Sequence, residues 1–279
     1  MTTDYIMGGE RETERLALKT EPVLICRHLA WAGLRAGESF VDFGCGSGEV
    51  VAEAARINHG ARVTALESDA ERVDYAATVC RQRGAAGVQF VTARVEGPGS
   101  SGLPDGTFDH AWARFLMEYV PAPVGVVREM KRVVRPGGKV TLIDVEGNGS
   151  RHFGMSDELR LGLDKVLGDL ATTGFDPDAG CRLAAQAAAA GLVGIRHEIE
   201  PYHRIVGRPD ARTATAWRLK IQALRDNYVG RLFPHKADMA WVFDAFLDFL
   251  MRDDTMTWSV LHLVQGRKPA PGDAAALME

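Results

Sequence analysis

The chain has 279 residues, of which 46% are apolar and 25% are charged, and its net charge is −4. These values are typical of globular domains, so the composition excludes a globally disordered chain. Proteins that bind nucleic-acid phosphates are usually basic or carry a basic stripe, so the composition disfavours nucleic acid as a partner. The length fits one enlarged domain or a domain with a cap.

Cysteine usage and hydropathy predict the compartment. No two of the four cysteines, Cys26, Cys45, Cys80 and Cys181, have CxxC spacing, so we expect no metal site. Four cysteines over this length do not make a disulfide framework, which favours a reduced cytoplasmic setting. The polar N-terminus lacks an apolar signal core, and no stretch is long and apolar enough to span a bilayer. We therefore expect a cytoplasmic protein without a membrane partner.

A helix is expected over residues 10–32, with a kink at Pro22. Short apolar strands then alternate with helical segments up to residue 146. Strands are expected at 39–43, 62–67, 88–92, 108–113 and 139–145, with a turn at 136–138 and helices at 47–58, 69–83 and 121–134. This alternation predicts an α/β fold with a doubly wound, mostly parallel sheet covered by helices on both faces.

The pattern changes after residue 146. Two more strands, at 193–204 and 255–265, would complete a seven-stranded sheet, and helices are expected at 156–172, 178–190, 209–230 and 235–252. We predict three parts: an N-terminal arm and helix at 1–32, a ligand-binding core at 33–146, and the remaining sheet with a helical cap at 147–279. Aromatic residues between Trp217 and Phe249 suit core packing, an apolar substrate pocket or the contact of a homo-oligomer.

The sharpest local signal is VDFGCGSGEV at 41–50, between a predicted strand and a predicted helix. Closely spaced glycines allow a tight turn and let a ligand approach the backbone at a helix N-terminus. Glu67 ends the next strand, 19 positions after Gly48, where α/β nucleoside sites place a carboxylate on the ribose hydroxyls. The dinucleotide pattern GxGxxG fails at Glu49, whose charge would repel a pyrophosphate. The turn therefore favours a nucleoside without phosphate over a nicotinamide cofactor.

Four segments in this order resemble the class I S-adenosylmethionine-dependent methyltransferases, in particular the small-molecule branch that acts on natural products. They are VDFGCGSGEV (41–50), ALESD (65–69), LPDGTFDHAW (103–112) and VVREMKRVVRPGGKVTLID (126–144). The resemblance covers residues 38–146 closely and extends loosely to the last strand. It implies a Rossmann-like sheet, S-adenosylmethionine as cofactor and a small-molecule methyl acceptor.

The resemblance also implies roles for single residues. The methionine part of the cofactor would lie against Asp42 and the backbone of Gly44, Cys45, Gly46 and Gly48. Glu67 would bind the ribose, while Ser68 and the Val95 N–H would contact the adenine, and Arg114 would face the cofactor from the opposite side.

Position 94 and the N-terminal segment add further candidates to the implied site. Arg94 occupies a place where the family often has Asp, and because arginine has no acceptor, Glu96 is the candidate replacement for the adenine contact. The N-terminal segment often folds over the site in such relatives, which makes Tyr5 and Arg11 candidate contacts.

Methyl transfer from a sulfonium needs chiefly an in-line nucleophile about 3 Å away, and a base only where the acceptor must lose a proton. His152, which follows the fifth strand, is the first candidate for a base, and Tyr119 is the second. A capping or surface histidine and a core tyrosine are the competing interpretations. The remaining candidates, for which ordinary structural roles are favoured, are His28, Tyr202, His203 and His235.

Three functions stay open at this stage. The first is methyl transfer to a small organic metabolite at oxygen, nitrogen or carbon. The second is a protein of this fold that binds S-adenosylmethionine without transferring methyl, as a cyclase-like or regulatory relative would. The third, a nicotinamide-dependent oxidoreductase, is disfavoured by Glu49.

Overall fold

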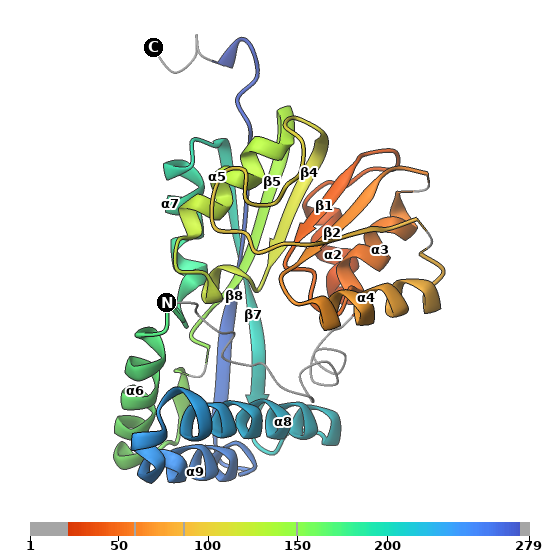
Figure 1. Ribbon diagram of the computed structural model, residues 1–279. Helices are drawn as coiled ribbons and strands as arrows, with labels where there is room; N and C mark the ends of the chain where they lie inside the picture. Colours follow the sequence, from red (N-terminus) through yellow and green to blue (C-terminus); the bar gives the residue numbers. More distant parts are fainter. Residues whose placement is uncertain (1–21, 59, 86, 149, 274–279) are drawn as a thin grey trace.

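The computed structural model describes residues 22–58, 60–85, 87–148 and 150–273 (Figure 1). Its helices are α2 (Pro22–Trp31), α3 (Glu49–Ile57), α4 (Ala70–Gln82), η1 (Met117–Tyr119), α5 (Pro123–Val133), α6 (Asp157–Ala171), α7 (Ala179–Ala189), α8 (Ala211–Asn227), η2 (Tyr228–Leu232), η3 (Pro234–Met239) and α9 (Ala240–Leu250). Its strands are β1 (Phe40–Phe43), β2 (Val63–Glu67), β3 (Gln89–Thr92), β4 (Phe108–Arg114), β5 (Val134–Glu146), β6 (His152–Phe153), β7 (Val193–Val206) and β8 (Met256–Arg267).

The strands form one sheet in the order β3-β2-β1-β4-β5-β8, with β7 on the far side of β8. Strands β1 to β5 are mutually parallel, whereas β8 runs antiparallel to β5 and to β7. The expected doubly wound, mostly parallel sheet is confirmed. The two-residue strand β6 was not predicted: it pairs with the start of β8, where β5 has already ended.

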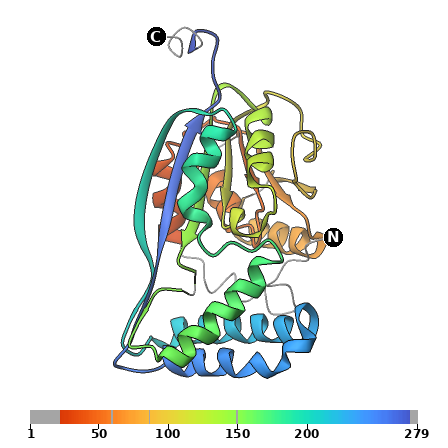
Figure 2. The same cartoon turned by 90° about the vertical axis from the view of Figure 1, so that its left-hand side faces the viewer.

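Helices cover both faces of the sheet, as short right-handed crossovers require. Ile25 and Leu29 of α2 pack with α3 and α4 in one buried cluster, and Val126 of α5 and Leu183 of α7 belong to a second. Figure 2 shows these two helical layers on opposite sides of the strands. Because helices cover both faces, every residue of β1 and β2 is buried, rather than every second one.

The third buried cluster lies outside these layers. Helices α6, α8 and α9 pack around aromatic side chains such as Trp217, Tyr228 and Phe243 and form a cap. Glu146, the last residue of β5, pairs with Val260 near the beginning of β8, so the parallel strands end on the side of the cap (Figure 1). The cap therefore stands at the edge of the sheet where α/β proteins bind their ligands.

The helices of the cap and the N-terminus differ from the sequence prediction. The helix expected at 209–230 ends at Asn227 and continues as the π-helical turn η2, in which Tyr228 is buried and its hydroxyl donates to Asp169. Pro234 then opens a 3₁₀ segment in place of the first turn expected at 235–252. Of the helix expected at 10–32, residues 10–21 lie outside the described residues.

The turn expected at 136–138 proves to be part of β5. Gly137 has a φ of 76°, its N–H donates to the carbonyl of Lys268, and the register with β4 shifts between Phe108 and His110. The glycines thus make a bulge inside one strand.

In the described part of the chain, no helix combines the length and apolarity of a membrane span.

Candidate cofactor and substrate site

The glycine-rich turn joins β1 to α3 with three residues in the left-handed region. Gly44, Gly46 and Gly48 have φ values of 75°, 52° and 81°. At Gly48 space is lacking too, because a Cβ would lie 2.8 Å from the Cβ and 2.9 Å from the Cα of Ala76 in α4. Only glycine satisfies both conditions. The turn is therefore packed closely against α4 on one side and presents backbone to a cavity on the other.

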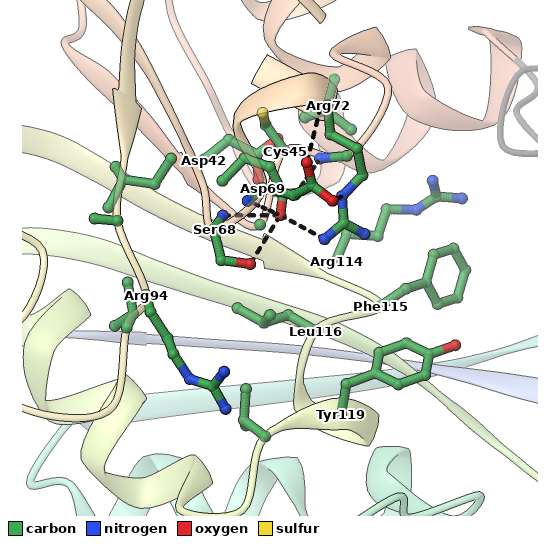
Figure 3. A pocket seen from close by; sticks show the side chains of 18 of the residues that line it. Asp42, Cys45, Ser68, Asp69, Arg72, Arg94, Arg114, Phe115, Leu116 and Tyr119 are labelled. Atoms are coloured by element: carbon green, nitrogen blue, oxygen red, sulfur yellow. Dashed lines mark hydrogen bonds and ion pairs between the residues drawn. The ribbon is translucent and has the colours of Figure 1, made fainter. Parts of the chain in front are cut away.

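Glu67 is the side chain that joins this turn to the loop after β2. Its exposed fraction is 6%, and one carboxylate oxygen accepts from the N–H of Gly46 at 3.1 Å. The other accepts from the N–H of Ser68 at 2.8 Å and lies 3.1 Å from a guanidinium nitrogen of Arg72 (Figure 3). A carboxylate offers about four acceptor positions, so the oxygen bound to Gly46 retains room for a ligand hydroxyl.

A cavity of about 470 Å³ opens at the carboxyl ends of β1, β2 and β4, within the size range of small-molecule sites. Nearly all residues expected around the cofactor line it: Asp42, Gly44, Cys45, Gly46, Glu67, Ser68, Arg94, Val95 and Arg114. Gly48 does not line it and acts through packing instead. Tyr5 and Arg11 lie outside the described residues.

Buried charges give the cavity its electrostatic character. Burial raises the pKa of Asp42 well above its ordinary value, Arg114 opposes this effect, and Glu67 adds to it. Burial also lowers the pKa of Arg114, whose guanidinium lies over the ring of Phe115 at 4.4 Å. Two acids on one cavity wall suit a ligand that carries positive charge, because a cation would favour the ionised carboxylates.

At the rim of the cavity near β3, Arg94 stands where the family often has Asp, and it is paired with a carboxylate. Arg94 Nε lies 2.9 Å from a carboxylate oxygen of Glu96, and both residues line the cavity beside Val95. A carboxylate is therefore still present at this rim, two positions along the chain. This arrangement is consistent with Glu96 as the replacement for the adenine contact.

Sequence reasoning missed Arg72 and misjudged Glu49. Arg72 lies in the first turn of α4, lines the cavity and pairs with both Glu67 and the N-cap residue Asp69. The sequence did contain a signal for this pairing, because Arg72 follows Asp69 by three positions, a spacing that brings side chains together on a helix. Glu49 lies 2.6 Å from Arg83, so its charge is compensated. The expected repulsion of a pyrophosphate is thus weaker than the sequence indicated.

The two catalytic candidates lie in different places. Tyr119, on η1, lines the cavity. His152 does not: its Nδ1 lies 3.0 Å from the hydroxyl of Thr257, and its ring meets Phe246 and Phe249 edge-on at 5.0 and 5.5 Å. The expectation that His152 is a base at the cofactor is therefore corrected, because the pairing of β6 with β8 turns this residue into the cap.

The other histidine candidates also have structural surroundings. His28 is fully buried in α2, burial lowers its pKa to about 4, and its Nε2 lies 3.1 Å from a carboxylate oxygen of Glu200. Its interpretation as an ordinary helix-face residue is corrected in one respect, since it belongs to the core. His235 is exposed on η3, and Tyr202 and His203 line a different groove.

Among the described residues, one group has the spacing of metal ligands. Donor atoms of Glu146, Cys181 and His262 lie within 4.8 Å of one another. His262 already bonds Glu146 and His197, both at 2.8 Å, and Arg151 forms an ion pair with Glu146. These partners satisfy the group, and none of the five residues lines the cofactor cavity.

A second, smaller cavity of about 50 Å³ lies within the cap and shares Tyr119 with the first. Its walls are mainly aliphatic and aromatic side chains of the cap helices, with Asn148 and Lys220 as polar members. Tyr119 thus lines both the cofactor cavity and a mainly apolar compartment.

Comparison with known proteins identifies the domain. A family model described as a methyltransferase domain matches residues 41–142. The chain is 28% identical over 159 residues to 27-O-demethylrifamycin SV methyltransferase of Amycolatopsis mediterranei, covering 52% of this chain and 56% of the relative. It is 32% identical over 146 residues to Methyltransferase GfsG of Streptomyces halstedii, covering 51% and 46%. The chain thus spans about half the length of these relatives.

The solved structure of the [4+2]-cyclase SpnF has the same fold, with a TM-score of 0.56 and 24% identity over 90% of this chain and 82% of that one. The cavity at the glycine turn, with Asp42 and Glu67 on its wall, fits a cofactor that carries a sugar diol and positive charge. S-adenosylmethionine has both. Residues 41–142 therefore match a methyltransferase domain, and the cavity that they help to form fits S-adenosylmethionine.

Proposed function

We propose that this protein transfers the methyl group of S-adenosylmethionine to a small organic acceptor held between the cofactor cavity and the cap. The observation that carries the proposal is the position of Tyr119, which lines both the cofactor cavity and the apolar cavity. An acceptor group in the apolar compartment would reach the cofactor past this single side chain. The names of the relatives, which include a rifamycin and a ubiquinone methyltransferase, agree with an organic acceptor.

The bound cofactor supplies an activated methyl group, so the protein's task is mainly to orient and to exclude water. Glu67 would hold the ribose diol, and Asp42 would attract the positive charge of the methionine part, which lies on its ammonium and sulfonium. The apolar side chains of the cap would keep water from the acceptor. Fixing two reactants in line can supply about 7–11 kcal/mol of the barrier reduction. Tyr119 is the residue placed to position the acceptor, and its hydroxyl offers both a donor and an acceptor.

The experiment that tests the cofactor site is a calorimetric titration of Glu67→Gln with S-adenosylhomocysteine. Hydrogen bonds to a charged group are worth about 1.5–3 kcal/mol, so affinity is expected to fall about 10- to 100-fold. Glu53→Gln is the matched control, because Glu53 is similarly buried in the same half of the protein and does not line the cavity. Equal affinity of wild type and Glu67→Gln would reject the site.

A second assay separates methyl transfer from cofactor binding alone. Release of S-adenosylhomocysteine is measured with a panel of acceptors that includes 27-O-demethylrifamycin SV, demethylated quinone precursors and simple phenols. Turnover with any member supports the proposal. Tight cofactor binding without release from every member would favour the cyclase-like or regulatory alternative.

A further inference from the structure

A groove of about 620 Å³ lies on the other side of the cap, between α2, β7 and the first turns of α8. It shares Trp217 and Lys220 with the apolar cavity, which in turn shares Tyr119 with the cofactor cavity. Shared side chains therefore link the cofactor cavity to the apolar cavity and the apolar cavity to the groove.

The groove is basic. Arg27, Arg204, Arg212 and Lys220 line it, whereas Asp210 is the one acid among its described lining residues. Asp210 is engaged as the N-cap of α8, where its side chain accepts from the N–H of Thr213 at 2.8 Å. Arg27 pairs with Glu200 outside the lining. A concave surface with this excess of positive charge concentrates anions.

Lys220 stands at the boundary between the groove and the apolar cavity. Its ammonium lies 2.6 Å from the side-chain oxygen of Asn148 and 4.6 Å from the ring centroid of Trp217. The amide of Asn148 donates in turn to Glu118 at 2.8 Å, and Glu118 is fully buried. This chain of contacts holds the ammonium in place. The ammonium has three donors, and one of them is used on Asn148.

The wall between the groove and the cofactor cavity contains backbone strain. Phe115 and His203 have φ values of 57° and 47°, and they are the non-glycine residues with positive φ among the described ones. Phe115 lines the cofactor cavity and stacks at 5.6 Å on Tyr202, which lines the groove beside His203. A register irregularity between Tyr202 and Ile205 accompanies the strain. Strain and bulges of this kind concentrate at functional sites.

We propose that the methyl acceptor is an acidic amphiphile, whose phosphate or carboxylate binds in the basic groove against Lys220. Its apolar part lies along Trp217, and its far end reaches the cap cavity lined by Tyr119. That end carries the oxygen, nitrogen or carbon atom that bonds to the methyl carbon as the sulfur of the cofactor leaves. The inference rests on the proposed function, because it assigns the acceptor class of that same site. It explains why a lysine lines both the groove and a mainly apolar compartment.

The test compares octyl phosphate with 1-octanol, which share one alkyl chain and differ in charge. Both are titrated calorimetrically into the 279-residue protein saturated with S-adenosylhomocysteine. Octyl phosphate is expected to bind at least about tenfold more tightly than 1-octanol, since charge-assisted hydrogen bonds contribute more than neutral ones. Its affinity should also fall as salt is raised.

Substitutions of groove residues test whether octyl phosphate binds in the groove. Lys220→Met, and separately the pair Arg204→Gln and Arg212→Gln at exposed positions, should each weaken octyl phosphate about tenfold and leave 1-octanol unchanged. Arg218→Gln is the matched control, because Arg218 is an exposed arginine of α8 that does not line the groove. Its affinities should equal those of wild type.

Three results would overturn the inference: equal binding of the two probes, no binding of either, or an equal loss in Arg218→Gln. Inorganic phosphate that competes as tightly as octyl phosphate would also overturn it, because the apolar part would then contribute nothing. Affinity for S-adenosylhomocysteine, measured in the same samples, separates this failure from failure of the proposed function. Intact cofactor binding with an unresponsive groove rejects the acceptor class alone.

Discussion

The cofactor half and the cap of this protein build their cavities in different ways. Around the cofactor cavity, the essential groups are a backbone turn and acids at strand ends, such as Asp42 and Glu67. In the cap, the cavity is made by side chains of α6, α8 and α9, which are far apart in the sequence. The first kind of site depends on local backbone geometry, and the second on how helices pack.

This difference determines which features tolerate change. A turn such as that at Gly48 allows one residue type, because both its φ and its distance from Ala76 exclude a Cβ. An apolar wall can be rebuilt from other side chains of similar volume at small cost. We therefore expect the cofactor half to be sensitive to single atoms and the cap to be adaptable to the acceptor.

The largest effect is expected for Gly48→Ala. A left-handed φ costs roughly 1–2 kcal/mol with a Cβ, and overpacking adds roughly 1–3 kcal/mol, so the free energy of unfolding should fall by about 2–5 kcal/mol. Gly60→Ala is the control, because Gly60 has the same φ of 81° and a Cβ added there would meet nothing within 4 Å. Urea denaturation measures the free energy of unfolding of both variants. Equal losses in the two variants would show that contact with Ala76 is unimportant.

A second prediction concerns the loss of folding stability at low pH, which we assign to His110 in the cofactor half. Burial lowers the pKa of His110 to about 3, and its Nε2 lies 2.7 Å from the hydroxyl of Thr141. The unfolded state binds a proton near pH 6.5 and the folded state does not, so this stability is present above pH 6.5 and is lost as the pH falls toward 3. At pH 5 the loss from His110 should be about 2 kcal/mol.

The measurement is the free energy of unfolding at pH 7.5 and pH 5. His110→Gln should reduce the difference between the two values, whereas His235→Gln, at an exposed cap position, should leave it unchanged. His28, whose pKa is lowered to about 4, acts in the same direction and remains in both variants. A pH dependence that is identical in His110→Gln and wild type would contradict the assignment.

The smallest effect is expected where the two halves meet. Tyr119→Phe removes one hydroxyl, and the loss of a typical hydrogen bond costs about 0.5–1.5 kcal/mol. We expect KM for an accepted substrate to rise roughly 2- to 12-fold, with little change in the affinity for S-adenosylhomocysteine. Tyr75→Phe on α4 is the control, since Tyr75 lines neither cavity. A loss confined to cofactor affinity would move Tyr119 from the acceptor side to the cofactor side.

The sequence by itself determined the fold class, the glycine turn and the place of Glu67. These features follow from neighbouring residues: strand and helix periodicities, glycines within five positions, and an acid at a strand end. Residues close in the chain keep much of this local relation however the rest of the protein packs. The resemblance to the methyltransferase family implied the roles of Asp42, Cys45, Ser68, Val95 and Arg114, and the structure places all five on the cavity wall.

Only the tertiary structure decided what distant elements bring together. The pairing of β6 with β8 carried His152 into the cap, and Arg83, which follows the last residue of α4, neutralised Glu49. Lys220 meets Asn148 across 72 positions of the chain. Such contacts depend on how whole helices and strands pack to bury their apolar faces, and no local pattern specifies that packing.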